Sequence, residues 1–491
     1  MYFMRKSNTM YRDFGNFGYI TDNRNFGYRF FKDNGDNNIG DRIVSHSGSI
    51  FLSVLERRPQ SIEDIIKKIS AYFVDTDIKE IKRDILEFYH MLEVEGFIVS
   101  GLTIEECIEK EKYEIYYGVN GSIQSKQISK ESNVKDNTTQ EFFDNYFKGK
   151  PQLTHVHIEI TSKCNERCIH CYIPHEKKTN IMEAEMFYNI LKQCRDLNVL
   201  NITISGGEPL SHRNFLDFLR KCYEYNFSVN VLSNLTLIDN EIIREMKMNP
   251  LICVQTSLYS MDADVHDEIT KVKGSFLKTK SAILKLIENG IPIQISCPIM
   301  KQNLGSYNEV VKWGNRNNVN VNSDFVIIGR YDHSIDNLNC RLSMEDIRNI
   351  TTDKIKNSKE YSQSLEKSNS DKKWLDNNDY ICSVCHSSIC ISEEGIVYPC
   401  AGWQGFIIEN INNKKLKDIW NNSPKISYLR DLRRKDFPKC LSCSERDFCT
   451  MCMVRNANES PTGDYLKVNS YYCEIARITK ELFYKMKGQK Y

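Results

Sequence analysis

The chain has 491 residues, of which 41% are hydrophobic and 27% are charged, and its formal net charge is +1. This length suits about three domains. The balanced charge excludes the strongly basic surface that binds nucleic acid or an anionic membrane. The first residues lack the apolar segment of a secretory signal, and no apolar run reaches the roughly 18 residues of a membrane helix. We therefore expect a cytoplasmic protein.

Cysteine is the unusual feature of the composition. The chain has 18 cysteines, and nine of them follow residue 380. In a reducing cytosol this density indicates metal or redox chemistry rather than disulfides. Six cysteines lie in helix or strand patterns and are expected to be buried, inert thiols: Cys107, Cys194, Cys222, Cys253, Cys297 and Cys340.

Residues 1–105 are predicted to form a small α+β domain. Turn residues separate short segments of strand character, and three helical segments and a last strand follow. The predicted strands are Phe17–Asp22, Gly27–Lys32, Asp41–Ser45 and Phe97–Ser100, and the predicted helices are Ser47–Leu55, Ile62–Phe73 and Asp77–Val94. This order is typical of a winged-helix domain.

The third helix of this domain disfavours DNA as its ligand. Acidic residues such as Glu80, Asp84 and Glu87 lie among its lysines and would repel phosphates. An alternative is strand addition, in which an extended peptide pairs with an exposed edge strand. A purely structural role is a further alternative.

Residues 106–150 are predicted to be a linker, because the part from 121 to 140 is polar and almost free of large apolar residues. From residue 151 to residue 345, strands and helices alternate. The predicted strands are Val156–Thr161, Asn201–Ser205, Ser228–Leu232, Leu251–Ser257, Ile291–Cys297 and Asp324–Ile328, with helices such as Glu183–Asp196, Asn214–Tyr225 and Phe276–Asn289 between them. Six strand–helix units predict a parallel sheet curved into a partial barrel, with its chemistry at the carboxyl ends of the strands.

Three cysteines follow the first of these strands at the spacing C-x3-C-x2-C. They are Cys164, Cys168 and Cys171. Three thiolates on one loop suit three corners of an iron–sulfur cube and leave the fourth iron free for another ligand. A zinc site is the alternative, with His170 or His175 as its fourth ligand.

Short polar segments follow the next strands. Strand two ends in Ser205-Gly206-Gly207-Glu208-Pro209, where two glycines allow close backbone approach to a ligand and a carboxylate can pair with an ammonium group. Strand three ends in Ser233-Asn234, and strand four ends in Thr256-Ser257. Their side chains suit sugar hydroxyls.

The last part of the chain is rich in cysteine. Residues 346–378 are predicted to be a polar helical bridge, and residues 379–491 a separate domain. Its ordered cysteine pattern consists of Cys382, Cys400, the pairs Cys440–Cys443 and Cys449–Cys452, and Cys473. Two C-x2-C pairs alone are compatible with a zinc ribbon.

Cys164, Cys168 and Cys171, together with Gly206–Pro209, resemble the radical S-adenosylmethionine (SAM) superfamily. The resemblance implies that the three cysteines hold a [4Fe-4S] cluster whose open iron binds the amine and carboxylate of SAM. It implies contacts to the methionine end of SAM from Gly206, Gly207 and Glu208, and makes Ser233, Asn234 and Ser257 candidates for ribose contacts. The segment His266–Phe276 also resembles the part that follows strand four in this family.

The C-terminal pattern resembles the SPASM domain of radical SAM peptide maturases, which usually holds two auxiliary [4Fe-4S] clusters. On this resemblance Cys382, Cys400 and Cys452 hold the first cluster. Its fourth ligand is Cys385 or Cys390, or its iron is open to a substrate thiolate. The second cluster is held by Cys440, Cys443, Cys449 and Cys473. This implies three clusters in all, with zinc or a single C-terminal cluster as the alternatives.

The N-terminal domain resembles PqqD-like peptide-recognition elements. The expected fold is therefore α/β: a partial (β/α)6 TIM-type radical SAM barrel, preceded by a winged-helix α+β domain and followed by a SPASM domain. This resemblance implies an enzyme that modifies a ribosomally made precursor peptide, whose leader docks on residues 1–100. Flavodoxin or ferredoxin is the expected electron donor, and neither nucleic acid nor a membrane is an expected partner.

The bond that the enzyme forms has several interpretations. The preferred one is a thioether from a cysteine sulfur to a carbon atom, made through a 5′-deoxyadenosyl radical. The alternatives are a carbon–carbon crosslink between side chains and sulfatase-type formylglycine formation. From another class, a cluster-bearing regulator that binds DNA is disfavoured by the Gly-Gly-Glu-Pro segment and the full barrel.

Overall fold

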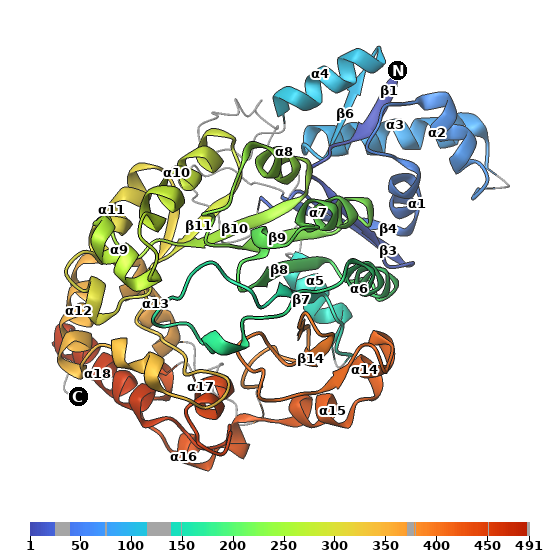
Figure 1. Cartoon of the computed structure of the whole chain (residues 1–491). Helices are drawn as coiled ribbons and strands as arrows, with labels where there is room; N and C mark the ends of the chain where they lie inside the picture. Colours follow the sequence, from blue (N-terminus) through green and yellow to red (C-terminus); the bar gives the residue numbers. More distant parts are fainter. Residues whose placement is uncertain are drawn as a thin grey trace.

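A computed structural model gives the fold of the chain (Figure 1). It describes residues 1–24, 40–73, 76–114, 139–148, 150–370, 378, 380–449 and 451–488. In this view the N-terminal domain, drawn in blue, lies to the upper right of the central sheet, and the C-terminal part, in orange and red, lies below it. The predicted strand Gly27–Lys32 lies outside the described residues.

The described residues of the N-terminal domain form two small sheets and four helices. Its elements are β1 (Tyr2–Arg5), β2 (Met10–Asp13), β3 (Phe17–Thr21), β4 (Asp41–Ser45), α1 (His46–Val54), β5 (Gln60–Ser61), α2 (Ile62–Ile69), α3 (Ile78–Val94), β6 (Ile98–Gly101) and α4 (Ile104–Glu114). The strand orders are β5-β1-β6 and β2-β3-β4. The predicted α+β organisation is therefore confirmed.

Local capping explains where the helices of this domain begin and end. The Ser61 hydroxyl accepts the Asp64 N–H at 3.1 Å and caps α2, as predicted from the sequence. Asp77 caps α3, and Gly96, with a φ of +85°, lets the chain turn into β6. Helix α4 was not predicted; it overlaps the start of the predicted linker and packs against β6 and β1.

The central domain follows helix α5 (Thr139–Tyr146) and alternates parallel strands with helices. Its elements are β7 (His155–Thr161), α6 (Ala184–Asp196), β8 (Asn201–Gly206), α7 (Phe215–Glu224), β9 (Ser228–Leu232), α8 (Asn240–Met248), β10 (Leu251–Ser257), α9 (Ala263–Thr270), α10 (Ser275–Glu288), β11 (Ile293–Ser296), α11 (Tyr307–Arg316) and β12 (Asn320–Asn322). The six strands pair in parallel in chain order. This is the predicted α/β partial barrel.

The sixth strand was predicted at Asp324–Ile328, which is wrong. The strand is β12, at Asn320–Asn322, paired with β11. Asn318 has a φ of +53°, so the chain turns directly from α11 into the sheet. Further on, the Asp324 carboxylate accepts the Val326 N–H at 2.8 Å and holds a turn.

Strand β7 has one apolar and one polar face. Val156, Ile158 and Ile160 are fully buried in the core beneath the helices. On the other face, His155 contacts the Thr203 hydroxyl at 2.8 Å, and His157 hydrogen-bonds Ser205. The interior of the partial barrel is therefore polar next to β7 and β8.

The C-terminal part consists of a helical bridge and a cysteine-rich domain. The bridge is α12 (Met344–Asn357) and α13 (Lys359–Ser370), as predicted. The domain contains β13 (Ser388–Ile391), β14 (Ile396–Tyr398), β15 (Glu409–Asn410), α14 (Leu416–Asn422), α15 (Pro424–Asp431), α16 (Pro438–Leu441), α17 (Met453–Asn458) and α18 (Ser470–Met486).

The cysteine-rich domain extends the sheet of the barrel. Strand β13 pairs in parallel with β7, with Ser388 opposite His155 and Ile391 opposite Ile158. The sheet therefore runs β12-β11-β10-β9-β8-β7-β13-β14-β15. This continuity places the C-terminal loops beside the carboxyl end of β7.

Side-chain hydrogen bonds hold the N-terminal domain against the barrel. Arg12 donates to the carbonyl of Asn226 at 3.0 Å, and Arg57 donates to that of Tyr223 at 2.7 Å. Asn226 lies in the turn before β9 and Tyr223 in the last turn of α7, so both acceptors are near the amino end of the sheet. This domain therefore binds the barrel at the end opposite to the cysteine loop.

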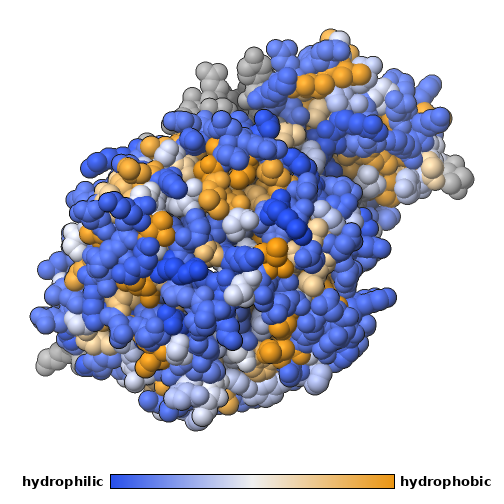
Figure 2. Space-filling model, in the orientation of Figure 1, coloured by the Kyte–Doolittle hydropathy of each residue, from blue (hydrophilic) through white to orange (hydrophobic). Residues whose placement is uncertain are grey.

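The surface in the view of Figure 2 is largely hydrophilic, with apolar side chains in separate patches. None of the helices in the described ranges has both the length and the apolar character needed to span a membrane. The six cysteines predicted to be inert are all buried.

Candidate functional site

Cys164, Cys168 and Cys171 lie on the loop that leaves β7, and each is partly exposed. The loop is held against α9, because Arg167 and Ile169 donate their N–H groups to the carbonyls of Thr270 and Ile269, both at 3.0 Å. Burial raises the pKa of the Cys168 thiol, and the nearby groups of Glu166, Cys171 and Cys164 raise it further. The three predicted thiols therefore lie near one another.

The two glycines after β8 are required by close packing against this loop. Gly206 has a φ of +139°, and a Cβ there would overlap the carbonyl oxygen of Thr161. A Cβ on Gly207 would overlap the carbonyl oxygen of Lys163. The N–H groups of Gly207 and Glu208 bind these same carbonyls at 2.7 and 2.8 Å. The glycine segment and the cysteine loop are thus joined backbone to backbone beside the end of β7, and we call this joined unit the cradle.

Glu208 is fully buried and is bound by protein donors. One carboxylate oxygen accepts the Leu210 N–H at 2.9 Å and the Ser233 hydroxyl at 2.7 Å, and the other accepts the Asn234 N–H at 2.7 Å. Burial raises its pKa to about 7, against the opposing effect of these hydrogen bonds. The carboxylate therefore holds the ends of β8 and β9 together. The sequence had predicted only that it pairs with an ammonium group.

The three residues predicted near a sugar lie in different surroundings. Ser233 is buried, and its hydroxyl also accepts the Leu235 N–H at 2.9 Å. Asn234 donates to the Asn165 side chain in the cysteine loop at 2.8 Å. Ser257 is partly exposed at the end of β10. Asn234 and Ser257 retain exposed surface at this edge of the sheet, whereas Ser233 faces inward.

The C-terminal cysteines form two groups. Burial raises the pKa of Cys400 to about 12, and the neighbouring thiols of Cys452 and Cys382 add to the shift. Burial also raises the pKa of Cys385 to about 12, with Cys382 and Cys400 nearby. Cys390 lies on β13, is fully buried and is close to Cys400. The first group therefore includes both of the extra cysteines considered for it.

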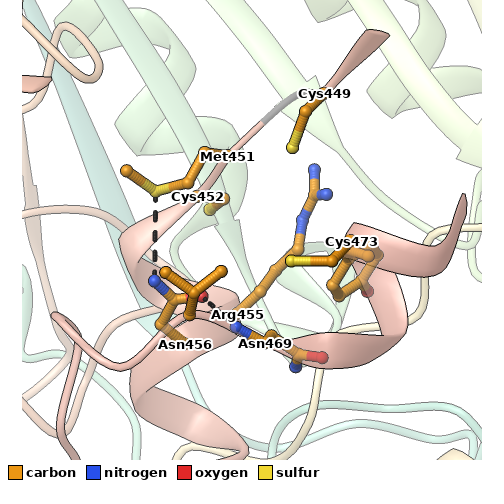
Figure 3. A pocket seen from close by; sticks show the side chains of 9 residues that line it. Cys449, Met451, Cys452, Arg455, Asn456, Asn469 and Cys473 are labelled. Atoms are coloured by element: carbon orange, nitrogen blue, oxygen red, sulfur yellow. Dashed lines mark hydrogen bonds between the residues drawn. The ribbon is translucent and has the colours of Figure 1, made fainter. Parts of the chain in front are cut away.

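The second group is Cys440, Cys443, Cys449 and Cys473. Burial raises the pKa of Cys449 to about 11, and the nearby thiols of Cys473, Cys440 and Cys443 raise it further. In Figure 3 the thiols of Cys449 and Cys473 point into one pocket, and the Arg455 guanidinium lies between them. The structure thus brings each predicted set of thiols together.

These groups have the donor chemistry of iron–sulfur clusters. Within the described ranges, no three His, Cys, Asp or Glu side chains converge on a point where they could hold a single metal ion. The thiolates of a four-iron cube each bind a different iron, so they surround a volume rather than a point. Clustered sets of three and four thiols are the donors that such a cube requires, so the residues present fit it.

An open cavity of about 430 Å³ adjoins this cradle. Gly206 lines it from the barrel, and Tyr331, Ser392, Glu393 and Gln404 line it from the C-terminal part of the chain. Glu159 of β7 lines it as well. The cavity thus joins the candidate cofactor site to the cysteine-rich domain.

Glu159 was not predicted as a site residue. Its two oxygens accept the Gln404 amide at 2.6 Å and the Tyr172 hydroxyl at 3.3 Å. Burial raises its pKa to about 8, and the Glu393 carboxylate adds to the shift. The sequence signal was weak, because Glu159 follows His155 and His157 on the polar side of an alternating strand.

Comparison with known families identifies two domains. Residues 158–314 match the model of the radical SAM superfamily, and residues 382–444 match that of the SPASM iron–sulfur cluster-binding domain. The chain thus contains a radical SAM domain and a SPASM domain, whose cofactors are SAM and [4Fe-4S] clusters.

Among curated relatives, the antilisterial bacteriocin subtilosin biosynthesis protein AlbA of Bacillus subtilis is 29% identical over 203 residues, which cover 40% of this chain and 44% of AlbA. The AdoMet-dependent heme synthase of Methanosarcina barkeri is 24% identical over 341 residues, which cover 64% of this chain and 94% of that protein. The alignment with AlbA thus spans less than half of that relative.

Among solved structures, Streptococcus suis SuiB bound to its precursor peptide SuiA superimposes with a TM-score of 0.55. The superposition covers 96% of this chain and 99% of SuiB, at 18% sequence identity. The two proteins therefore share a fold along nearly their whole length, including the N-terminal domain.

Proposed function

Starting from a radical SAM domain joined to a SPASM domain, we propose that this protein modifies a ribosomally made precursor peptide. The modification is a thioether crosslink between a cysteine sulfur and a carbon atom of the peptide. The named relative AlbA acts in the biosynthesis of a bacteriocin, and SuiB binds a precursor peptide. Both relationships support a peptide substrate.

The observation that carries the proposal is the cavity shared by the two domains. Gly206 of the candidate SAM cradle and Ser392–Glu394 of the SPASM domain line the same space. A peptide side chain in this cavity would lie beside Gly206 of the candidate SAM site and beside the SPASM segment that follows Cys390. Such an arrangement suits an oxidation in which a cofactor at one end of the cavity removes a hydrogen atom from the peptide and a cofactor at the other end accepts an electron.

The leader of the precursor would dock on the N-terminal domain by adding a strand to β4. In the described part of this domain, β4 pairs only with β3, and this supports strand addition at its other edge. Arg42 of β4 forms an ion pair with Glu95 at the end of α3, which fixes the strand next to the helix. Docking there would raise the effective concentration of the core peptide at the cavity.

The cofactors supply the difficult chemistry: with an electron from flavodoxin or ferredoxin, bound SAM provides a 5′-deoxyadenosyl radical at a reduced [4Fe-4S] cluster. The cysteines at 164, 168 and 171 would hold this cluster. Gly206 and Gly207 let the end of β8 pack backbone to backbone against the cysteine loop, and Glu208 holds the ends of β8 and β9 together. The cysteine groups of the SPASM domain would hold two auxiliary clusters.

A carbon–carbon crosslink is the second candidate. It uses the same cavity and the same loss of two hydrogen atoms, so the geometry supports it as well. Sulfatase-type formylglycine formation requires no leader-docking domain, and the N-terminal domain of this chain favours a crosslinked peptide over it.

The test combines anaerobic reconstitution with peptide analysis. We expect about twelve irons per chain, and formation of 5′-deoxyadenosine after reduction with SAM present. Replacing Cys164, Cys168 and Cys171 together by alanine should leave about eight irons and abolish deoxyadenosine formation. SAM cleavage by this triple variant would contradict the assignment.

The bond type is tested with short candidate precursors encoded next to this protein. A thioether product loses two hydrogen atoms per crosslink, and its cysteines no longer react with iodoacetamide. A carbon–carbon product shows the same mass change but keeps reactive cysteines. SAM cleavage without any change in such peptides would contradict a peptide-maturing function.

A further inference from the structure

We propose that Lys178 binds the carboxylate of SAM. This inference rests on the part of the proposed function that places SAM beside the cysteine loop, and it adds a protein group for the negatively charged end of the cofactor. Glu208, which the sequence predicted near the methionine end, is an acid whose oxygens are bound by protein donors. A carboxylate of the cofactor needs a cation, and Glu208 does not supply one.

The backbone of Lys178 is fixed beside the start of the cysteine loop. Lys178 follows the short helix η1 (His175–Lys177), where the chain returns from this loop to the barrel. The N–H groups of Thr179 and Asn180 both donate to the Ser162 hydroxyl, at 3.2 and 2.9 Å. The residues on either side of the loop are therefore tied together directly next to Lys178.

The side chain of Lys178 is turned into the protein. The residue is only 8% exposed, whereas the neighbouring Lys177 is exposed and lines the open cavity. In the part of the chain that the structure describes, the Lys178 ammonium forms neither an ion pair nor a hydrogen bond. A cation held away from water without a partner is unfavourable. Its burial therefore indicates an anionic ligand.

The charge of Lys178 acts on the loop that is predicted to hold the first cluster. Burial raises the pKa of Cys164 to about 11, and Lys178 opposes this effect. Burial also raises the pKa of Glu166 to about 7, against a hydrogen bond from Cys168 and the charge of Lys178. Burial lowers the pKa of His170 to about 4, and Lys178 lowers it further. The ammonium therefore lies on the inner side of the cysteine loop.

The other cations near this loop are less suited to bind an anion there. Lys163 is exposed. Arg167 is also exposed, and its guanidinium donates to two backbone carbonyls of its own loop at 2.9 and 3.2 Å. Arg330 is paired with Asp336 at 2.8 Å. Lys178 is distinguished from all three by combining burial with an ammonium that has donors to spare.

The charges of SAM explain why its carboxylate would be the ligand. The carboxylate is negative, whereas the sulfonium is positive and is repelled by a lysine. An ammonium group offers three donors from one compact charge, and its hydrogen bonds to a carboxylate are strengthened by that charge. Lys178 would therefore bind the carboxylate and orient the methionine end of SAM against the cradle.

The experiment measures SAM binding to the reconstituted holoenzyme, kept oxidised so that no SAM is cleaved. The variants are Lys178→Met, Lys178→Gln and Lys178→Arg. Lys177→Met is the matched control, because it removes the adjacent, exposed lysine. The two ligands are SAM and its neutral carboxamide analogue, in which an amide replaces the carboxylate. Equilibrium dialysis gives the dissociation constant of labelled SAM, and competition with it gives that of the analogue.

Lys178→Met should raise the dissociation constant of SAM about thirtyfold or more, because a buried charge pair loses one partner. The dissociation constant of the carboxamide should change less than about threefold, because this ligand has no negative charge to lose. Lys178→Arg keeps the charge and should retain most of the affinity for SAM, and Lys177→Met should bind both ligands like the wild type. Iron content equal to that of the wild type excludes a folding defect.

Equal SAM affinities of Lys178→Met and Lys177→Met would overturn the inference, and so would equal losses for SAM and the carboxamide. Should Lys178→Met lose iron, Lys178→Gln, which keeps a polar side chain, is measured in its place. Loss of about four irons in both variants would assign the lysine to the cluster instead of SAM and overturn the inference as well.

The proposed function fails by a different result. A wild-type enzyme that binds SAM through Lys178 but crosslinks no peptide would contradict peptide maturation and leave the role of Lys178 intact. A reconstituted wild type that binds no SAM would contradict both.

Discussion

The carboxylate of Glu208 accepts the backbone N–H of Asn234 at 2.7 Å and so joins the end of β8 to the end of β9. Asn234 in turn donates its side-chain amide to Asn165 of the cysteine loop at 2.8 Å. Three segments that are far apart in the chain are thus connected through one buried acid. We infer that Glu208 is a positioning residue for the SAM cradle.

Replacing Glu208 by alanine should weaken SAM binding. The N–H groups of Leu210 and Asn234 would lose their acceptor, at a cost of about 1–3 kcal/mol for each buried group. We expect the dissociation constant of SAM to rise at least about tenfold while iron content is retained. Equilibrium dialysis with the reconstituted protein measures it. The control is Glu183→Ala, which removes an exposed carboxylate paired with Arg213, and an affinity equal to that of this control would contradict the positioning role.

Gly206→Ala should disrupt the cradle itself. The added Cβ would overlap the carbonyl of Thr161, and the φ of +139° is strained for any residue other than glycine. We expect the cysteine loop to shift, with loss of about four irons per chain and of SAM binding. Gly305→Ala is the matched control, because a Cβ there meets nothing within 4 Å. Full iron content in Gly206→Ala would show that the loop tolerates the methyl group.

Arg455 should raise the reduction potential of the second auxiliary cluster. Its guanidinium lies between the thiols of Cys449 and Cys473 (Figure 3), and its Nε is buried without a hydrogen-bond partner in the described part of the chain. A nearby positive charge stabilises the reduced, more negative form of a cluster. Arg455→Met should therefore shift this potential to a more negative value in a redox titration followed by electron paramagnetic resonance.

The conservative variant and a distant variant make the potential measurement specific. Arg455→Lys keeps the charge and should retain most of the wild-type potential. Arg477→Met removes an exposed arginine that is paired with Glu474, and it should leave the potential unchanged. A potential in Arg455→Met equal to that in Arg477→Met would contradict the electrostatic role.

The ion pair between Arg341 and Glu459 should contribute strongly to stability. Arg341 precedes the bridge helix α12, Glu459 belongs to the SPASM domain, and their side chains are 9% and 13% exposed. Arg341 also donates to the carbonyl of Ile327 at 2.6 Å. Glu459→Gln leaves a buried guanidinium without its counter-ion and should cost about 3–5 kcal/mol in the free energy of unfolding, measured with urea.

The comparison for this pair is the more exposed pair of Arg348 and Glu481, whose side chains are 36% and 31% exposed. Glu481→Gln should cost less than about 1 kcal/mol, because water screens such a pair. Equal costs for the two substitutions would indicate that burial of the Arg341 pair contributes little.

Much of the fold was predictable because its signals are local. The alternation of apolar residues in Val156–Ile160 and the cap at Ser61 depend only on neighbouring residues. Strand six was misplaced because Asp324–Ile328 has strand character, whereas the φ of +53° at Asn318 starts the strand earlier. Helix α4 was missed because its sequence is polar and acquires a partner only through packing on β1 and β6.

The candidate site, like the fold, was only partly predictable from the sequence. The cysteine spacing and the two glycines identified the cradle, since each residue type there has few other uses at that spacing. Glu208 was expected to face the ligand, but its buried oxygens are bound by Ser233 and by the N–H groups of Leu210 and Asn234. A motif identifies a residue type, whereas its hydrogen-bond partners depend on how two strand ends meet.

By itself the sequence determined the order of the three domains, the parallel α/β barrel and the set of clustered cysteines. Only the tertiary structure decided that β13 pairs with β7 and that Glu159 meets Gln404 across the domain boundary. These partners are more than 200 residues apart, and each strand could pair with any free sheet edge of matching pattern. Long-range pairing is settled by the packing of whole domains, which a local pattern does not encode.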